Sequence, residues 1–279
     1  MRQSRILNKI RNTDEVAIAT CLHLTDPSVF ELASMIGFDG IWMDLEHHGY
    51  SVETAGQMMR AARVGNADIV ARPAKGEFMR MARLLEMGAT GIMYPRCSDA
   101  AEAKEVVRWG KFAPLGQRGF DGSSADASYC TVPMRDYVKY ANEQTFLLIQ
   151  MEEPSAIAQA EAIAATPGVD MLMLGPADFS VLTGIPGQLD HPTVLEAIKK
   201  VSDAARNTGK HWAATCGSME LAKELIRMGC RLIFHGADIV MVKNGLELIR
   251  SRVAEHLNIH LAPPTSPMNL APTKSYLER

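Results

Sequence analysis

Side chains able to perform acid–base catalysis gather where a short apolar segment of this 279-residue chain ends. The apolar run at 40–43 is followed by Asp44, Glu46, His47 and His48. Buried parallel strands are typically continuous hydrophobic runs, and parallel α/β barrels carry their chemistry at the carboxyl ends of such strands. The segment therefore predicts a buried strand that delivers carboxylates and an imidazole to a reaction site.

Three further apolar segments end in polar residues. These are Arg72, which precedes a proline; Gln150 and Glu152; and Asp178, which follows the turn Gly175, Pro176 and Ala177. Taken one at a time, such residues are more often structural, since an arginine there forms salt bridges and an aspartate caps a helix. Their coincidence at four strand ends indicates one reaction site at one edge of a parallel sheet.

Glu152 and Asp178 end consecutive predicted strands. Neighbouring parallel strands lie about 5 Å apart, so the two carboxylates can converge on one point. Converging carboxylates repel each other unless a proton or a cation lies between them. Two are too few for a calcium site but suit Mg²⁺ or Mn²⁺, which keep several waters. The alternative, two carboxylates that cap successive helices, stays open.

The tandem histidines offer one candidate base. Successive strand residues point to opposite faces, so only one of His47 and His48 faces the site if the strand continues through them. That imidazole can act as a base near neutral pH, with Asp44 as its candidate orienting partner. A Schiff-base mechanism needs a buried lysine at the site. Lys75 lies instead where a loop leads into a helix, and Lys243 lies inside a helical pattern, so neither ends a strand.

Eight apolar segments of strand type alternate with stretches of helical periodicity. The segments are Val16–Leu22, Gly40–Leu45, Asp68–Pro73, Gly91–Tyr94, Phe146–Met151, Met171–Leu174, Trp212–Thr215 and Leu232–Phe234. Such alternation predicts a parallel sheet. We expect a closed (β/α)₈ TIM barrel rather than an open doubly wound sheet, because no Gly-x-Gly-x-x-Gly follows the first segment.

Two intervals interrupt this rhythm, 111–145 and 183–192. The first is long and rich in Gly, Ser, Asp and Pro, which predicts a lid or a binding loop. We expect residues 1–260 to form a single barrel domain that includes an N-terminal segment and a C-terminal helix. The proline-rich residues 261–279 predict an extended or disordered tail.

Composition excludes several classes of protein. A hydrophobic fraction of 47% and a charged fraction of 22% are typical of globular domains. The net charge of −3 without a basic block excludes a nucleic-acid partner. No apolar run is long enough to span a membrane, and no signal core precedes the first strand. Five scattered cysteines predict reduced thiols and a cytoplasmic location.

The chain resembles the HpcH/HpaI family of metal-dependent pyruvate aldolases, in which the order of motifs matches from about residue 15 to residue 255. Taken together the motifs are specific, although only the Glu-His and Gly-Pro-Ala-Asp segments are distinctive alone. The carrying motifs lie at 37–47, 70–73, 84–89, 116–119, 150–152 and 175–178.

The resemblance implies a (β/α)₈ barrel in which Glu152 and Asp178 bind a divalent metal, Mg²⁺ or Mn²⁺ with Co²⁺ as a third candidate. It implies that His47 is the base and that Arg72 and Gln150 lie near the oxo acid. Further implied contacts to substrate come from the backbone of Gly175, Pro176 and Ala177 and from Arg118. A homo-oligomer, expected to be a hexamer with its last helix exchanged between subunits, is also implied.

The chain departs from the family pattern at two positions. His48 stands where many relatives carry a small residue, and its larger side chain is expected to narrow the part of the site that receives the aldehyde. Glu86 stands where relatives often carry Asp, in a site that a neighbouring subunit completes. Asp44 and Glu86 are expected to lie one layer further from substrate, where they would orient the residues that contact it.

The residues and the resemblance converge on a lyase that cleaves a 4-hydroxy-2-oxo acid to pyruvate and an aldehyde. The reaction passes through an enolate, which a divalent ion and a fixed Arg72 guanidinium would stabilise. A base such as His47 must remove the hydroxyl proton. One alternative is a citrate-lyase-like or CoA-ester lyase, but the sequence has no basic cluster at a strand end to bind the phosphates of CoA. The other is a non-catalytic barrel that binds an oxo acid.

Overall fold

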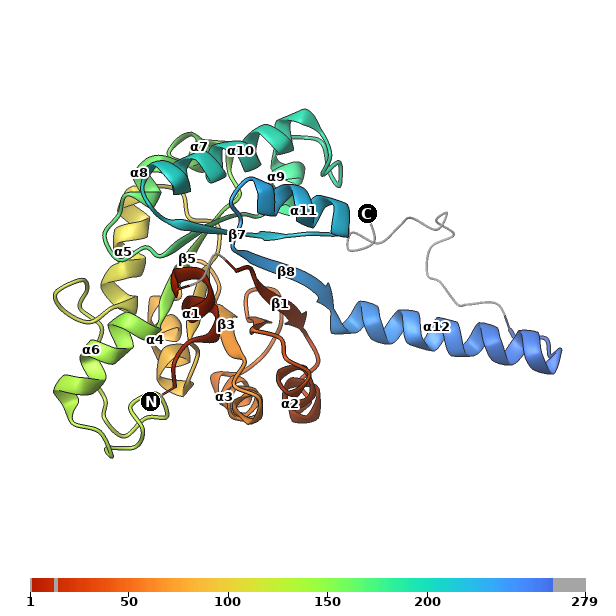
Figure 1. Ribbon diagram of the computed structural model, residues 1–279, viewed down its shortest axis with the longest axis horizontal. Coiled ribbons are helices and arrows are strands. Elements are labelled where there is room, and N and C mark those ends of the chain that lie inside the picture. Colours follow the sequence, from red (N-terminus) through yellow and green to blue (C-terminus); the bar gives the residue numbers. More distant parts are fainter. Residues whose placement is uncertain (1, 13–14, 263–279) are drawn as a thin grey trace.

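The computed structural model describes residues 2–12 and 15–262, in which eight parallel strands form a closed barrel in chain order (Figure 1). β8 pairs back with β1, so the open doubly wound alternative is wrong and the expected TIM barrel is confirmed. The strands are β1 Ala17–Leu22, β2 Gly40–Asp44, β3 Asp68–Arg72, β4 Gly91–Tyr94, β5 Phe146–Met151, β6 Met171–Leu174, β7 His211–Thr215 and β8 Leu232–Ala237.

Helices surround most of the barrel and bury the outward side chains of the strands. They are α2 Pro27–Met35, α3 Val52–Ala61, the 3₁₀ turn η1 Ala62–Val64, α4 Phe78–Met87, α5 Ala100–Gly110, α7 Pro154–Ala158, α8 Ala160–Ala164, α9 Pro176–Leu182, α10 Pro192–Asn207 and α11 Met219–Arg227. Every residue of β3, β4, β5 and β6 is buried, as expected for strands covered on both faces.

The N-terminal helix α1, Arg5–Asn12, covers the end of the barrel where the strands begin. Its residues Ile6, Leu7 and Ile10 pack against the inward side chains of the strand starts. Asp68 at the start of β3 fixes this helix by accepting hydrogen bonds from the Ser4 hydroxyl at 2.6 Å and from the Ile6 amide at 2.9 Å. The chemistry must therefore lie at the opposite, carboxyl-terminal end.

The long interval 111–145 contains helix α6, Met134–Gln144, whose apolar residues form a small separate core with Phe112. The Lys111 ammonium donates to the Thr145 carbonyl at 2.7 Å, directly before β5 begins. Midway through the interval, the Asp126 amide donates to the Glu86 carbonyl in the last turn of α4, so the interval stays at the amino-terminal edge of the barrel. A lid over the strand ends of its own chain, one of the two roles expected, is wrong, and the binding role stays a prediction.

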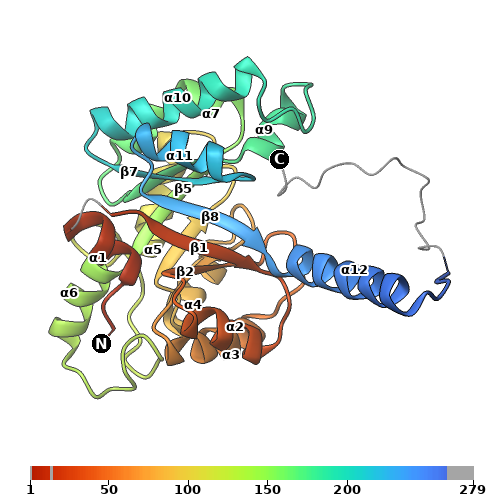
Figure 2. The ribbon, with the colours of Figure 1, turned by 45° about the vertical axis from the view of Figure 1, so that its right-hand side comes forward.

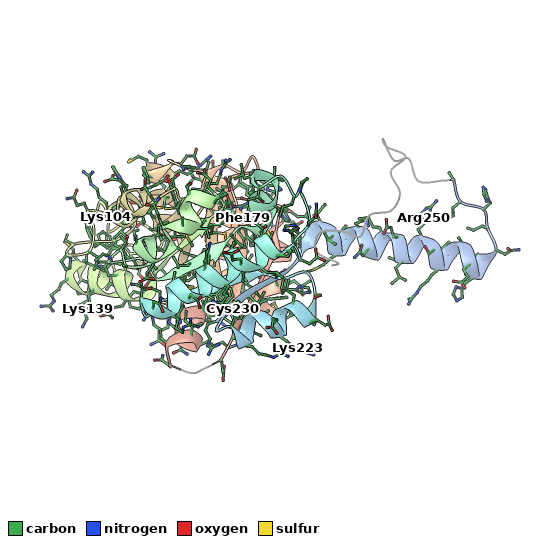
Figure 3. The ribbon with its side chains drawn as sticks, turned by 90° about the horizontal axis from the view of Figure 1, so that it is seen from above. Lys104, Lys139, Phe179, Lys223, Cys230 and Arg250 are labelled. Atoms are coloured by element: carbon green, nitrogen blue, oxygen red, sulfur yellow. The ribbon has the colours of Figure 1, made fainter. Side chains whose placement is uncertain are left out.

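Helix α12, Asp238–Leu257, continues from β8 and projects away from the barrel (Figures 1 and 2). Viewed from above, Arg250 on this helix lies clear of the barrel that holds Phe179 and Cys230 (Figure 3). Asp238 is its one buried residue, and large apolar side chains along it are exposed: Ile239, Met241, Val242, Leu246, Leu248, Ile249, Val253 and Leu257.

The outer layer is also incomplete over β1. Ile18, the second residue of β1, points away from the barrel interior and is 49% exposed, although the other residues of the strand are buried. Within the described ranges, no helix combines the length and the apolar character needed to cross a membrane. The expected tail at 261–279 lies almost entirely outside the described residues.

Candidate active site

The carboxyl ends of β2 and β3 fix an arginine at the mouth of the barrel. Asp44 and Arg72 are paired in register, and both side chains are buried. The Arg72 Nε and Nη2 atoms donate to the two oxygens of Asp44 at 2.9 and 2.8 Å, a fork-to-fork contact of the strong, directional kind. The guanidinium also lies over the Trp42 ring, 4.6 Å from its centroid. Arg72 is therefore held in one orientation.

Hydrogen bonds continue from this arginine across the mouth to β5. Arg72 Nη1 donates to Gln150 Oε1 at 3.4 Å, and Gln150 Nε2 donates to Glu152 Oε1 at 2.6 Å. All three side chains are buried. Arg72, predicted from the end of one strand, and Gln150 and Glu152, predicted from the end of another, are thus joined in one network.

Glu152 lies among carboxylates with little to neutralise it. Its pKa is raised to about 8, first by burial and then by the negative charges of Asp178 and Glu46, while Arg72 and Arg96 act in the opposite direction. Burial also raises the pKa of Glu46. Two carboxyl groups whose pKa values are raised by burial and by the negative charges around them have the electrostatics of a cation site.

The turn between β6 and α9 approaches Glu152 as closely as a backbone can. A Cβ atom on Gly175 would lie 2.3 Å from Glu152 Oε1 and 2.8 Å from Gln150 Nε2, so only glycine fits. Pro176 begins α9, and Asp178 lies in its first turn. Helix geometry leaves the first amide groups of α9, such as that of Ala177, without partners inside the helix.

The two histidines lie beyond the end of β2, so strand alternation does not decide their orientation. The His47 side chain is 55% exposed, with Nε2 at 3.6 Å from Glu46 Oε2. His48 Nδ1 lies 3.3 Å from Asp44 Oδ2. Asp44 therefore contacts His48 and Arg72, whereas Glu46 is the carboxylate beside His47.

Two predicted residues lie away from this network. Arg118 is buried in the 111–145 interval, where it donates to Asp126 at 2.6 Å and lies over the Phe112 ring. Glu86 lies in the last turn of α4, and its carbonyl accepts from the Asp126 amide. Both lie on the amino-terminal side of the barrel, away from the network at the strand ends.

The candidate lysines do not reach the strand ends as buried amines. Lys75 donates to the Arg96 carbonyl and the Ser98 hydroxyl with its side chain 38% exposed. Lys243 pairs with Glu247 on the exposed helix α12. A Schiff-base mechanism therefore has no support in the described part of the chain.

Several residues of the site lie outside the predicted set. Arg96 follows β4 with a left-handed backbone, φ 51°, and its Nε lies 4.0 Å from Glu152 Oε2. His23 and Asp238 follow β1 and β8, and their side chains are 3.0 Å apart. A polar residue just past a strand end is the signal that could have identified all three. Asp238 escaped it because β8 extends to Ala237, three residues beyond the predicted end.

Among residues 2–12 and 15–262, no three His, Cys, Asp or Glu side chains are grouped as a complete metal site. Glu152 and Asp178 nevertheless fit a divalent ion, because their mutual repulsion is the feature that a cation removes. An ion of the Mg²⁺ type completes its shell with waters and substrate oxygens, so two protein carboxylates suffice.

Comparisons with known proteins agree with this geometry. The family model described as HpcH/HpaI aldolase/citrate lyase matches residues 20–244. The hydroxypyruvate/pyruvate aldolase of Pseudomonas aeruginosa is 31% identical over 249 residues, 89% of this chain and 92% of that protein. The 4-hydroxy-2-oxo-heptane-1,7-dioate aldolase of Escherichia coli is 30% identical over 236 residues, 84% of this chain and 89% of that protein.

The solved structures give the same result. The crystal structure of an HpcH/HpaI aldolase from Desulfitobacterium hafniense superposes with a TM-score of 0.83 at 26% identity, covering 94% of this chain and 99% of that one. The residues that the family model matches, 20–244, include the strand ends that carry the network. The chain therefore belongs to the HpcH/HpaI aldolase/citrate lyase family and is a carbon–carbon lyase of the aldolase type.

Proposed function

We propose that this enzyme is a metal-dependent, class II aldolase that reversibly cleaves a 4-hydroxy-2-oxo acid to pyruvate and an aldehyde. One observation carries the proposal: the buried Glu152, its pKa raised to about 8 by burial and by Asp178 and Glu46, lies in the same network as a fixed Arg72. The names of the two aldolases above support this reaction class.

Glu152 and Asp178 would hold the metal ion, for which Mg²⁺ and Mn²⁺ are the leading candidates and Co²⁺ the third. When bound, such an ion supplies Lewis-acid stabilisation to the negative charge that develops on the oxo acid. Gly175 keeps the space beside Glu152 free of side-chain atoms. The first amides of α9, which have no partners inside the helix, would hold the carboxylate of the oxo acid, with Pro176 and Ala177 shaping the turn.

Arg72 stabilises the enolate. Because Asp44 and Trp42 fix the guanidinium, its position needs no rearrangement as negative charge develops. Its Nη1 atom lies on the side of Gln150, toward β5 and the carboxylates. A lysine at this position would supply the positive charge but not the pair of parallel donors by which Asp44 fixes the guanidinium.

His47 acts as the base. It removes the proton from the 4-hydroxyl group, the bond between C3 and C4 breaks, and the electron pair of that bond forms the pyruvate enolate as the aldehyde leaves. A proton then returns to C3 to give pyruvate. The exposed imidazole, with Glu46 at 3.6 Å, is free to exchange its proton with solvent after each turnover.

We further propose a cytoplasmic homo-oligomer, with a hexamer as the expected form. The exposed apolar residues of α12 and the exposed Ile18 on β1 support exchange of this helix between subunits, since no part of residues 2–12 and 15–262 covers either apolar surface. The five cysteines are free, as expected for a reducing compartment.

The test is pyruvate release from a generic 4-hydroxy-2-oxo acid, coupled to lactate dehydrogenase, with and without EDTA. We expect metal-dependent release that Mg²⁺ or Mn²⁺ restores after chelation. Full activity in EDTA would overturn the metal assignment. Cleavage of citrate or of a CoA ester in place of the oxo acid would favour the alternative lyase.

A further inference from the structure

The carboxyl ends of β1 and β8 carry a hydrogen-bonded cluster that the proposed mechanism does not use. It consists of His23, just after β1, Asp238, the first residue of α12, and two residues of the loop after β2, His48 and Tyr50. β1 and β8 lie side by side and end where α12 begins (Figures 1 and 2).

Asp238 fixes the chain that follows β1. Its carboxylate accepts hydrogen bonds from the backbone amides of His23, Leu24 and Ile239 at 2.8–2.9 Å and lies 3.0 Å from His23 Nδ1. Burial alone would raise the pKa of Asp238, but these donors lower it. The ionised carboxylate therefore orients the His23 ring with Nδ1 as donor.

The His23 ring has no nitrogen left for a substrate. Its Nε2 atom lies 3.5 Å from Cys21 Sγ. Burial raises the pKa of the Cys21 thiol, so the thiol keeps its proton and can donate it to Nε2. With both nitrogens engaged, His23 is suited to hold its neighbours in place rather than to transfer protons itself.

The neighbours of His23 belong to the loop that carries the proposed base. The His23 and His48 rings are 4.5 Å apart, and the Tyr50 hydroxyl donates to the His23 carbonyl. His48 is bound on its other side to Asp44. Glu46 and His47 lie in the same short loop, directly before these two contacts.

We propose that Asp238 and His23 are positioning residues that hold the 45–50 loop, and with it His47, in place for proton transfer. This inference rests on the proposed function, in which His47 is the base. Asp238 is the first residue of α12, so the cluster also connects the first turn of the projecting helix with the loop that carries His47.

The test compares two reactions of one protein. Aldol cleavage needs the base, whereas oxaloacetate decarboxylation forms the same enolate with no hydroxyl proton to remove. Asp238→Ala should lower kcat for cleavage by about 10- to 100-fold, since a displacement near 1 Å can cost about 100-fold. The KM for the oxo acid and the decarboxylation rate should change by less than about threefold.

A double-mutant cycle with His47→Ala identifies the route. If Asp238 acts through His47, then Asp238→Ala should have no further effect on cleavage once His47 is absent. His23→Ala should behave in the same way and carries the test if Asp238→Ala does not fold. Asp238→Asn, which keeps one acceptor oxygen, should recover part of the lost kcat.

Asp170→Ala is the matched control. Its carboxylate also fixes backbone, accepting from the Leu147 amide at 2.9 Å, but at the opposite edge of the barrel. It should affect both reactions equally and add to His47→Ala. If the Asp238 and His23 variants behave like this control, the positioning role is wrong. If wild-type protein lacks metal-dependent cleavage, the proposed function is wrong instead.

Discussion

Glu152 is a buried carboxyl that lies among other negative charges. It is 1% exposed and its pKa is raised to about 8 by burial and by Asp178 and Glu46. Glu152→Gln or Asp178→Asn should abolish cleavage and Mn²⁺ binding, measured by titration calorimetry, while circular dichroism stays that of the wild type. The fold survives because removing one carboxylate relieves repulsion.

The half-buried Glu153, next along the chain and outside the network, provides the control for this experiment. Glu153→Gln should retain both cleavage and ion binding. The metal assignment is wrong if Glu152→Gln or Asp178→Asn keeps near-normal activity in EDTA.

The two adjacent histidines should differ in their effects. His47→Ala should lower aldol cleavage by about 10² to 10⁴, the usual contribution of a positioned base, with a much smaller effect on pyruvate binding. His48→Ala should be milder and should alter the preference for the aldehyde. Steady-state kinetics with two aldehydes of different size measure both. Greater damage from the His48 variant would show that the base has been assigned to the wrong ring.

Among the elements, the turn between β6 and α9 leaves no room for a side chain at Gly175. Gly175→Ala would place a methyl group 2.3 Å from Glu152 Oε1, so Glu152 must move. We expect Mn²⁺ affinity and kcat to fall at least about tenfold, since Glu152 can no longer hold its position. Gly119→Ala, where a Cβ meets no atom within 4 Å, is the control. Equal kinetics of the two variants would contradict this role of the turn.

The strands were predictable because burial on both faces makes each a continuous apolar run. The same reasoning predicts that Asp44, Arg72, Gln150 and Glu152 lie at one edge of the sheet, and hydrogen bonds join the four side chains there. The end of β8 was missed because its last residues include His235 and Gly236, which interrupt the apolar run.

Other features depend on contacts that no local pattern encodes. Helix α6 was not predicted because its surroundings are polar and its small core includes Phe112, which lies far from it in sequence. Arg118 was assigned to substrate from a motif, and its partner in the fold is Asp126. The course of α12, away from its own barrel, likewise does not follow from its sequence pattern (Figure 1).

For the molecule as a whole, stability should depend on pH and metal together. A carboxyl with a higher pKa in the folded chain stabilises the fold only when protonated. For Glu152, whose pKa rises from 4.5 to about 8, this contribution is complete below pH 4.5 and is lost as the pH rises through 8. The Tm of metal-free protein should therefore fall between about pH 5 and pH 8.

Mn²⁺ should offset this loss, because the cation replaces the proton between the carboxylates. Differential scanning calorimetry should show a larger gain in Tm on adding Mn²⁺ at the higher pH. In Glu152→Gln, the fall in Tm as the pH rises and the gain in Tm on adding Mn²⁺ should both be smaller. An equal gain at both pH values would contradict the linkage.

Exchange of the methyl protons of pyruvate, followed by proton NMR in D₂O, tests the metal-assisted enolate most directly, because it needs no aldehyde. In the presence of Mg²⁺ or Mn²⁺ the wild-type protein should exchange these protons for solvent deuterium, and EDTA should stop this exchange. Arg72→Ala should impair exchange and cleavage alike, and Arg72→Lys should recover only part, since lysine lacks the fork. Aldol cleavage by wild-type protein without metal-dependent exchange would contradict the enolate mechanism and the role of Arg72.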